Sequence, residues 1–231
     1  MAKRVDPIRE AGLLRKFNTP VGTGKYLHIE SPDFEFDKNG AFKVKLFFDP
    51  NQNDVQSMMT TFDGLLEEAM EYFTSQAKNA REAKKVRPSE NTPYYFEEDE
   101  DGKQTGLIYI NPKMVASGTT KEGEAWTRKV PIFDAKGVRV VEKLNAGGGT
   151  TMTVALELRP YYNAQSGVGI SLKLKGVQIA ELKTFGGSIQ TAEDAGFGEI
   201  DGGFSADTFE SPTEDASAPE AEAEDDGSGD Y

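Results

Sequence analysis

Two neighbouring segments within Gly147–Gly187 alternate strictly between apolar side chains and polar or small ones. The inward residues of the first segment are Met152, Val154, Leu156 and Leu158, and those of the second are Val168, Ile170, Leu172 and Leu174. A period of two is typical of a strand with one buried face. At Gly176 the phase shifts by one residue, so Val177 and Ile179 become the inward pair. This shift predicts a β-bulge, which bends strands in small closed barrels. The pair is therefore predicted to form one wall of such a barrel.

Upstream of this pair, the sequence predicts shorter strands and one long helix. Alternating or β-branched and aromatic patterns indicate strands at Lys25–Glu30 and Ala41–Phe48. Asp49-Pro50 then has the residue types of a helix N-cap and first helical position. Apolar residues follow at spacings of three and four, which predicts an amphipathic helix over about 50–85. The order of elements favours a mainly β (α+β) domain, a small antiparallel barrel with one capping helix.

The charge of the chain is divided unevenly along its length. The net charge is −13, but residues 193–231 hold 14 acidic residues and no Lys or Arg, which leaves 25 acidic and 26 basic residues in 1–192. The acidic segment is rich in Gly, Ala and Ser and has too few apolar residues to build a core. We therefore expect a basic N-terminal arm (1–24), a barrel domain (25–187) and a disordered acidic tail (188–231).

Several function classes are disfavoured by composition. The chain has no cysteine and a single histidine, His28, so thiolate metal sites and most histidine-based catalysis are excluded. No Ser-His-Asp grouping or metal-spaced carboxylate cluster can be argued, so an enzyme is disfavoured and no cofactor is expected. No run of about 18 apolar residues is present, so we expect no membrane partner.

A nucleic-acid-binding set of residues remains. Single strands are bound by aromatic rings that stack on bases and by positive side chains that follow the phosphates. Two tyrosines lie where a loop should join the two central strands, and basic residues lie on the outward face, beside the single tryptophan and at the end of the long helix. These candidates are Tyr161, Tyr162, Trp126, Arg128, Lys129, Lys173, Lys175, Arg81, Lys84 and Lys85. The alternatives are core or loop-anchor roles for the rings and a helix-dipole role for the basic cluster.

The acidic tail suggests a second function. A tethered polyanion has a high effective concentration near any phosphate-binding groove. We therefore expect it to compete with nucleic acid and to be released when nucleic acid binds.

Two other functions of the whole chain remain as alternatives to nucleic-acid binding. One is an acidic DNA mimic or inhibitor that binds proteins, and the other is a metal-dependent nuclease that uses carboxylates.

The segments GGGTTMTVALELRPYY, VGISLKL and AELKTFGG, followed by an acidic tail with a terminal aromatic residue, resemble the single-stranded DNA-binding proteins of short-tailed T-odd phages. The resemblance implies an OB-fold barrel capped by a helix. It also implies sequence-nonspecific binding of single-stranded DNA in phage replication, recombination and repair, annealing of complementary strands, and an intracellular location in the host cytoplasm. In this family the tail recruits the phage DNA polymerase and helicase-primase, and dimers depend on the tail.

The same resemblance assigns roles to individual residues. The stacking tyrosine after proline matches Tyr161, whereas Asn163 stands where a tryptophan partner is expected, which makes Tyr162 the substitute. The basic residue after the long helix matches Arg81, with Lys84 and Lys85 as its neighbours. Further matches are Lys3 at the basic N-terminus and, in the partner-binding tail, Asp225, Asp226, Asp230 and Tyr231.

Overall fold

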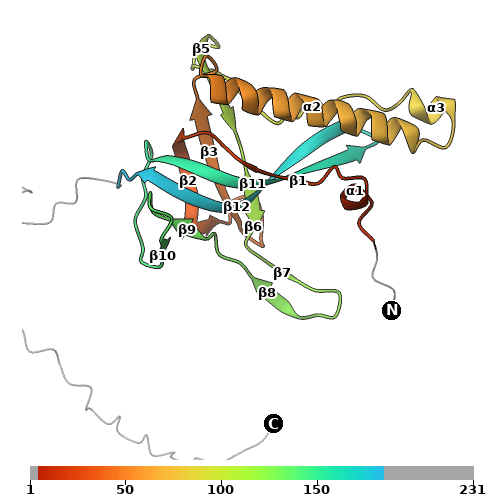
Figure 1. The fold of residues 1–231 in the computed structure, drawn as a ribbon. Coiled ribbons are helices and arrows are strands. Elements are labelled where there is room, and N and C mark those ends of the chain that lie inside the picture. Colours follow the sequence, from red (N-terminus) through yellow and green to blue (C-terminus); the bar gives the residue numbers. More distant parts are fainter. Residues whose placement is uncertain (1–4, 185–231) are drawn as a thin grey trace, which may run out of the picture. The chain divides into compact units, whose positions relative to one another are not determined.

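The computed structural model describes residues 5–184, which fold around one curved sheet with a long helix packed on it (Figure 1). The helices in this range are α1 (Pro7–Glu10), α2 (Asn53–Ser75) and α3 (Ala80–Ala83). The strands in this range are β1 (Arg15–Asn18), β2 (Gly22–Asp33), β3 (Ala41–Phe48), β4 (Tyr95–Glu98), β5 (Gln104–Ile110), β6 (Lys113–Val115), β7 (Ser117–Thr119), β8 (Ala125–Thr127), β9 (Ile132–Phe133), β10 (Arg139–Val140), β11 (Thr151–Asn163) and β12 (Gly167–Glu181).

Five strands close into a barrel. β11 pairs with β2, β2 with β3, β3 with β6, β6 with β12, and β12 returns to β11. β1 adds to the side of β11, β5 pairs with β3 and carries β4, and β9 pairs with β12 and carries β10. This antiparallel-rich barrel has five strands and carries the long helix α2 between its strands β3 and β6, which is OB-fold-like, as the family resemblance implied.

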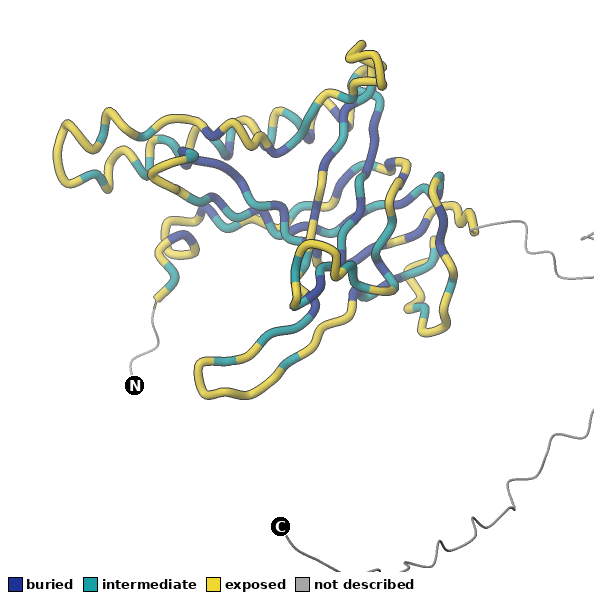
Figure 2. The backbone as a smooth tube through the Cα atoms, turned by 180° about the vertical axis from the view of Figure 1, so that it is seen from behind, coloured by how far each residue is buried: buried dark blue, intermediate teal, exposed yellow. Residues whose placement is uncertain are grey.

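The bulge predicted at Gly176 is confirmed. Ala155 is paired with Gly176 and the next residue, Leu156, with Leu174, so Lys175 is the extra residue of β12. The alternation on both sides of the bulge is also confirmed, because every predicted inward residue of β11 and β12 is buried. Figure 2 shows buried residues alternating with more exposed ones along these strands. The bulge keeps apolar side chains on the core face while the strand turns around the barrel.

The long helix differs from its prediction at both ends. Its N-cap is Gln52 and not Asp49, which instead accepts hydrogen bonds from the backbone N–H and side chain of Asn51 in the preceding turn. The helix ends at Ser75 and does not continue to residue 85. Asn79 adopts an extended conformation and caps α3, where its Oδ1 accepts a hydrogen bond from the Glu82 N–H at 2.9 Å. A strong N-cap residue thus starts a new helix and divides the predicted one.

The predicted packing role of the helix is confirmed. Val55, Met58, Phe62, Leu65 and Ala69 are buried in α2, which contacts β11 and β12. Figure 1 shows α2 lying across the end of the sheet that these two strands form. Past Ala69 the side chains of the helix are half-buried or exposed, so tertiary contacts support its last turns less.

The predicted N-terminal arm is wrong for residues 5–24, which belong to the folded domain. Ile8 and Leu13 join the hydrophobic core, and β1 pairs with β11 from Arg15 opposite Leu158 to Asn18 opposite Ala155. The sequence pattern missed β1 because its four residues alternate too briefly to be distinguished from a loop. Lys3 and the predicted tail residues, including Tyr231, lie outside the described residues.

Candidate nucleic-acid interface

Lysines from neighbouring strands are aligned in two rows on the outer face of the barrel. In the first row, Lys43 of β3 lies opposite Lys113 of β6, which lies opposite Lys173 of β12. In the second row, Lys25 of β2 lies opposite Lys45 of β3. Like charges directly opposite each other destabilise a sheet, so these rows reduce stability and favour an anionic ligand. We call this surface the basic face; its members are Lys25, Lys43, Lys45, Lys113, Lys173 and Lys175.

A row of aromatic rings runs beside the second lysine row. Phe47 of β3 lies opposite Tyr109 of β5, which lies opposite Tyr95 of β4. Ring centroids are 5.5 Å apart for Phe47 and Tyr109 and 5.4 Å apart for the stacked pair Tyr109 and Tyr95. Lys45 Nζ lies 3.9 Å from the Tyr109 centroid, and Lys25 Nζ lies 4.2 Å from that of Phe47. Phe47 is buried, whereas both tyrosines are partly exposed.

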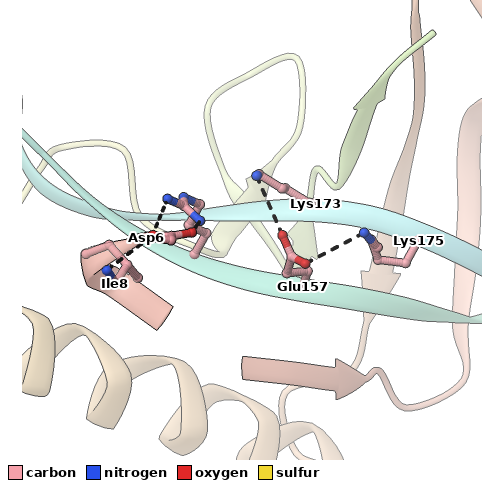
Figure 3. A network of polar contacts seen from close by, with 6 residues as sticks. Asp6, Ile8, Glu157, Lys173 and Lys175 are labelled. Atoms are coloured by element: carbon pink, nitrogen blue, oxygen red, sulfur yellow. Dashed lines mark hydrogen bonds and ion pairs between the residues drawn. The ribbon is translucent and has the colours of Figure 1, made fainter. Parts of the chain in front are cut away.

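Carboxylates partly neutralise the basic face. The two carboxylate oxygens of Glu157, from β11, lie 3.6 Å from Lys173 Nζ and 3.7 Å from Lys175 Nζ (Figure 3). Asp33 forms an ion pair with Lys43. Among the described residues, Lys113 forms no ion pair, which leaves its charge available to a ligand.

A third carboxylate lies at the other end of the face. Glu97 Oε1 is 3.1 Å from Lys25 Nζ, and its other oxygen accepts a hydrogen bond from the Thr105 hydroxyl at 2.7 Å. The Thr105 hydrogen bond, followed by Lys25, holds the pKa of Glu97 below its usual value. Glu97 is therefore ionised at neutral pH and lowers the positive potential around Lys25.

Tyr161 and Tyr162 belong to β11 and not to a loop, so that prediction is wrong. They are paired with Gly169 and Val168 of β12, because alternation and pairing continue to Asn163. Successive residues point to opposite faces of a strand. Tyr162 packs on Phe73 of α2, with ring centroids 5.8 Å apart. The two rings therefore do not form one stacking platform.

Tyr161 lies on the same side of β11 as Glu157. Its ring covers Gly169, where an added Cβ would lie 2.5 Å from the tyrosine hydroxyl. Burial, with smaller contributions from Tyr109 and Tyr161, raises the pKa of Tyr95. Tyr161 and Tyr95 also line one cavity together. The structure thus joins Tyr161 to the aromatic row through Tyr95.

Trp126 lies in the β7–β8 hairpin, which extends from the body of the barrel (Figure 1). Its indole contacts Gly118, where an added Cβ would lie 2.5 Å from the ring, and the Arg128 guanidinium lies 4.2 Å from its centroid. Arg128 and Lys129 are exposed. The ring therefore supports Arg128 by a cation–π contact, and a base would have to displace that side chain to stack there.

Arg81, Lys84 and Lys85 lie in α3 and the turn after it, and all three are exposed. The chain that follows them is fixed to the β11–β12 hairpin, since Arg87 donates a hydrogen bond to the Gln165 carbonyl at 2.9 Å. The Val168 N–H also donates to the Arg87 carbonyl at 2.8 Å. The basic cluster is thus held near the hairpin end that carries Tyr161.

A family model described as the single-stranded DNA-binding protein of bacteriophage T7 matches residues 21–182. The chain belongs to this family. The single-stranded DNA-binding protein of Enterobacteria phage T3 is 28% identical over 212 residues, covering 85% of this chain and 88% of the relative. That of Escherichia phage T7 is 27% identical over 185 residues, covering 74% and 78%. The family resemblance seen in the sequence is therefore confirmed.

Solved structures of such proteins share the fold. The crystal structure of gp2.5, a single-stranded DNA-binding protein encoded by bacteriophage T7, matches with a TM-score of 0.62 at 24% identity, covering 84% of this chain and 99% of gp2.5. The single-stranded DNA-binding protein from bacteriophage Enc34 in complex with ssDNA matches with a TM-score of 0.51 at 14% identity, covering 74% and 89%. These likenesses support the OB-fold-like architecture.

Most of the basic and aromatic face of this family member was missed by sequence reasoning. Lys43 and Lys45 alternate with buried residues in Ala41–Phe48, which was a usable signal for an outward basic strip. Lys113, Tyr95 and Tyr109 gave no such signal, because their position depends on how distant strands pair.

Proposed function

We propose that this chain is a sequence-nonspecific single-stranded DNA-binding protein of phage replication and recombination, and that it acts by binding and not by catalysis. The basic face contacts phosphates, while Tyr161, Tyr95 and Tyr109 offer ring surface to unpaired bases. Relatives in the family are named for binding single-stranded DNA, and the Enc34 protein was solved with ssDNA bound. The cross-strand alignment of Lys43, Lys113 and Lys173 carries the proposal, because it concentrates charge at a cost to sheet pairing.

Binding to oligo-dT and to a duplex of equal length should be measured across a range of salt concentrations. Phosphate contacts release counterions, so the logarithm of affinity falls with the logarithm of salt concentration by about 0.7 for each contact on a single strand. Changing both Lys45 and Lys113 to Gln should make this dependence on salt shallower by about 1.4, because two phosphate contacts are lost. Lys136→Gln, in the exposed turn between β9 and β10, is the matched control and should leave the slope unchanged.

Two results would contradict the proposal. One is equal affinity for the single strand and the duplex. The other is an unchanged salt slope in the double lysine variant, which would place the phosphates elsewhere. A gel shift with oligo-dT also separates DNA binding from a DNA-mimic function, and incubation of single-stranded DNA with the protein and magnesium separates binding from a nuclease activity.

The remaining site residues extend the same surface in this proposal. Arg128 and Lys129 on the hairpin side, and Arg81, Lys84 and Lys85 after α2, contact phosphates beyond the barrel, and Lys3 does so from the N-terminus. Tyr162 supports the site by packing on Phe73. Trp126 orients Arg128.

We assign the recruitment of partners to the acidic tail. Asp225, Asp226, Asp230 and Tyr231 are its proposed contacts with the phage DNA polymerase and helicase-primase, and dimerisation through the tail belongs to the same proposal. The working location is the host cytoplasm. Among residues 5–184, no helix combines the length and apolar character needed to span a bilayer.

A further inference from the structure

A cavity of about 550 Å³ opens between the aromatic row and the end of the β11–β12 hairpin. Its volume lies within the roughly 300–1,000 Å³ of small-ligand sites. Tyr95 and Tyr161 line it together with apolar residues of β12, and Lys113 lies at its wall. The cavity thus combines two rings and one cation that forms no ion pair among the described residues.

Apart from Lys113 and Thr92, whose hydroxyl donates to the Tyr94 carbonyl, three neutral polar side chains line this cavity. Asn91 precedes β4, Asn111 follows β5, and Ser171 lies on β12. Within residues 5–184, the side chains of these three residues form no hydrogen bond with other protein groups. A side-chain amide carries both a donor and an acceptor, so it can pair with the edge of any nucleobase by turning over. A phosphate would instead need positive groups or backbone N–H groups. In this cavity the positive group is Lys113.

We propose that this cavity is a subsite for one unpaired nucleobase. The base lies against Tyr95 and Tyr161, its hydrogen-bonding edge meets the amides of Asn91 and Asn111, and its flanking phosphate meets Lys113. Because those amides take the edge that pairs with a complementary strand, the subsite admits a base only from a single strand. This inference rests on the proposed function. It adds to that function a site at which the protein contacts a nucleobase and not only the sugar-phosphate backbone of the DNA.

The experiment compares oligo-dT with an abasic strand of the same length and charge, using the full chain. Changing both Asn91 and Asn111 to Ala should weaken binding of oligo-dT about three- to tenfold and leave binding of the abasic strand unchanged. Lys113→Gln should weaken binding of both strands by similar factors, because it contacts phosphate. Asn18→Ala, an exposed amide of β1, is the matched control and should change neither.

A second measurement locates the base directly. An oligonucleotide that carries 5-iodo-deoxyuridine should cross-link to Tyr95 or Tyr161 on irradiation, and the yield should fall in the double asparagine variant. Cross-links confined to other residues would overturn the subsite. So would equal weakening of oligo-dT and the abasic strand, or no weakening of either.

The outcomes also separate this inference from the proposed function. A wild-type chain that binds neither strand would overturn both. A wild-type chain that binds oligo-dT, with a double asparagine variant that binds it equally well, would overturn the subsite alone.

Discussion

Glu157 is a single carboxylate that contacts two lysines of the basic face. It is less exposed than the lysines that it contacts, with 19% of its side chain accessible against 45% for Lys173 and 56% for Lys175. A phosphate that binds both lysines must displace this carboxylate or share them with it. Lys173 and Lys175 are thus already paired before DNA arrives, and their contribution to affinity depends on the exchange of partners.

We therefore expect Glu157→Gln to tighten binding of single-stranded DNA. Exposed ion pairs are worth about 0.2–1 kcal/mol each, so each lysine released from Glu157 corresponds to a gain of up to about fivefold in affinity at low salt. Fluorescence anisotropy with a labelled oligo-dT measures it. Glu71→Gln, on the exposed side of α2, is the control. Unchanged affinity would mean that Lys173 and Lys175 do not contact the strand.

Gly169 positions Tyr161 without contacting a ligand itself. An added Cβ would lie 2.5 Å from the Tyr161 hydroxyl and 2.6 Å from its ring. Gly169→Ala should therefore displace the ring while β11 and β12 stay paired. Because stacking is worth about 1–3 kcal/mol per base, affinity for oligo-dT should fall about tenfold with little loss of thermal stability. Tyr161→Ala should weaken binding similarly, and a variant with normal affinity would remove this ring from the site.

At the scale of elements, the local patterns were sufficient for the central strand pair. Alternation and a glycine predicted β11, β12 and the bulge that places Lys175 beside Lys173, because each of these is determined by neighbouring residues. The helix end and the lysine rows were not predicted. The end of the helix depends on Asn79, which caps a new helix. The lysine rows depend on the register of β3, β6 and β12, which lie far apart in the chain.

The β7–β8 hairpin carries the only tryptophan of the chain, so its fluorescence reports on this element alone. Since Arg128 lies over the indole, we expect DNA bound to the barrel to quench Trp126 only slightly. Arg128→Ala should uncover the ring and reduce affinity through the loss of one phosphate contact. Strong quenching of the wild-type protein at saturation would instead show a base stacked on Trp126. Titration with oligo-dT at low salt measures both.

For the molecule as a whole, charge is separated along the chain. Residues 1–192 are nearly neutral in sum, yet the strand register places several lysines on one face of the barrel. The charged side chains of residues 193–231 are all negative. The acidic segment and a DNA strand carry charge of the same sign, so we expect both to be attracted to the basic face. Tethering raises the local concentration of the acidic segment, so the two should exclude each other.

Deleting residues 207–231 removes ten acidic residues and no basic one. We expect the shortened protein to bind oligo-dT more tightly at low salt, with a difference that shrinks as salt rises, because screening weakens competition between exposed charges. A control of full length, with those ten residues changed to Asn or Gln, separates charge from tail length and should match the deletion. If the deletion binds no better than the full chain, the tail does not compete for the basic face. If only the deletion tightens binding, the tail acts by bulk and not by charge.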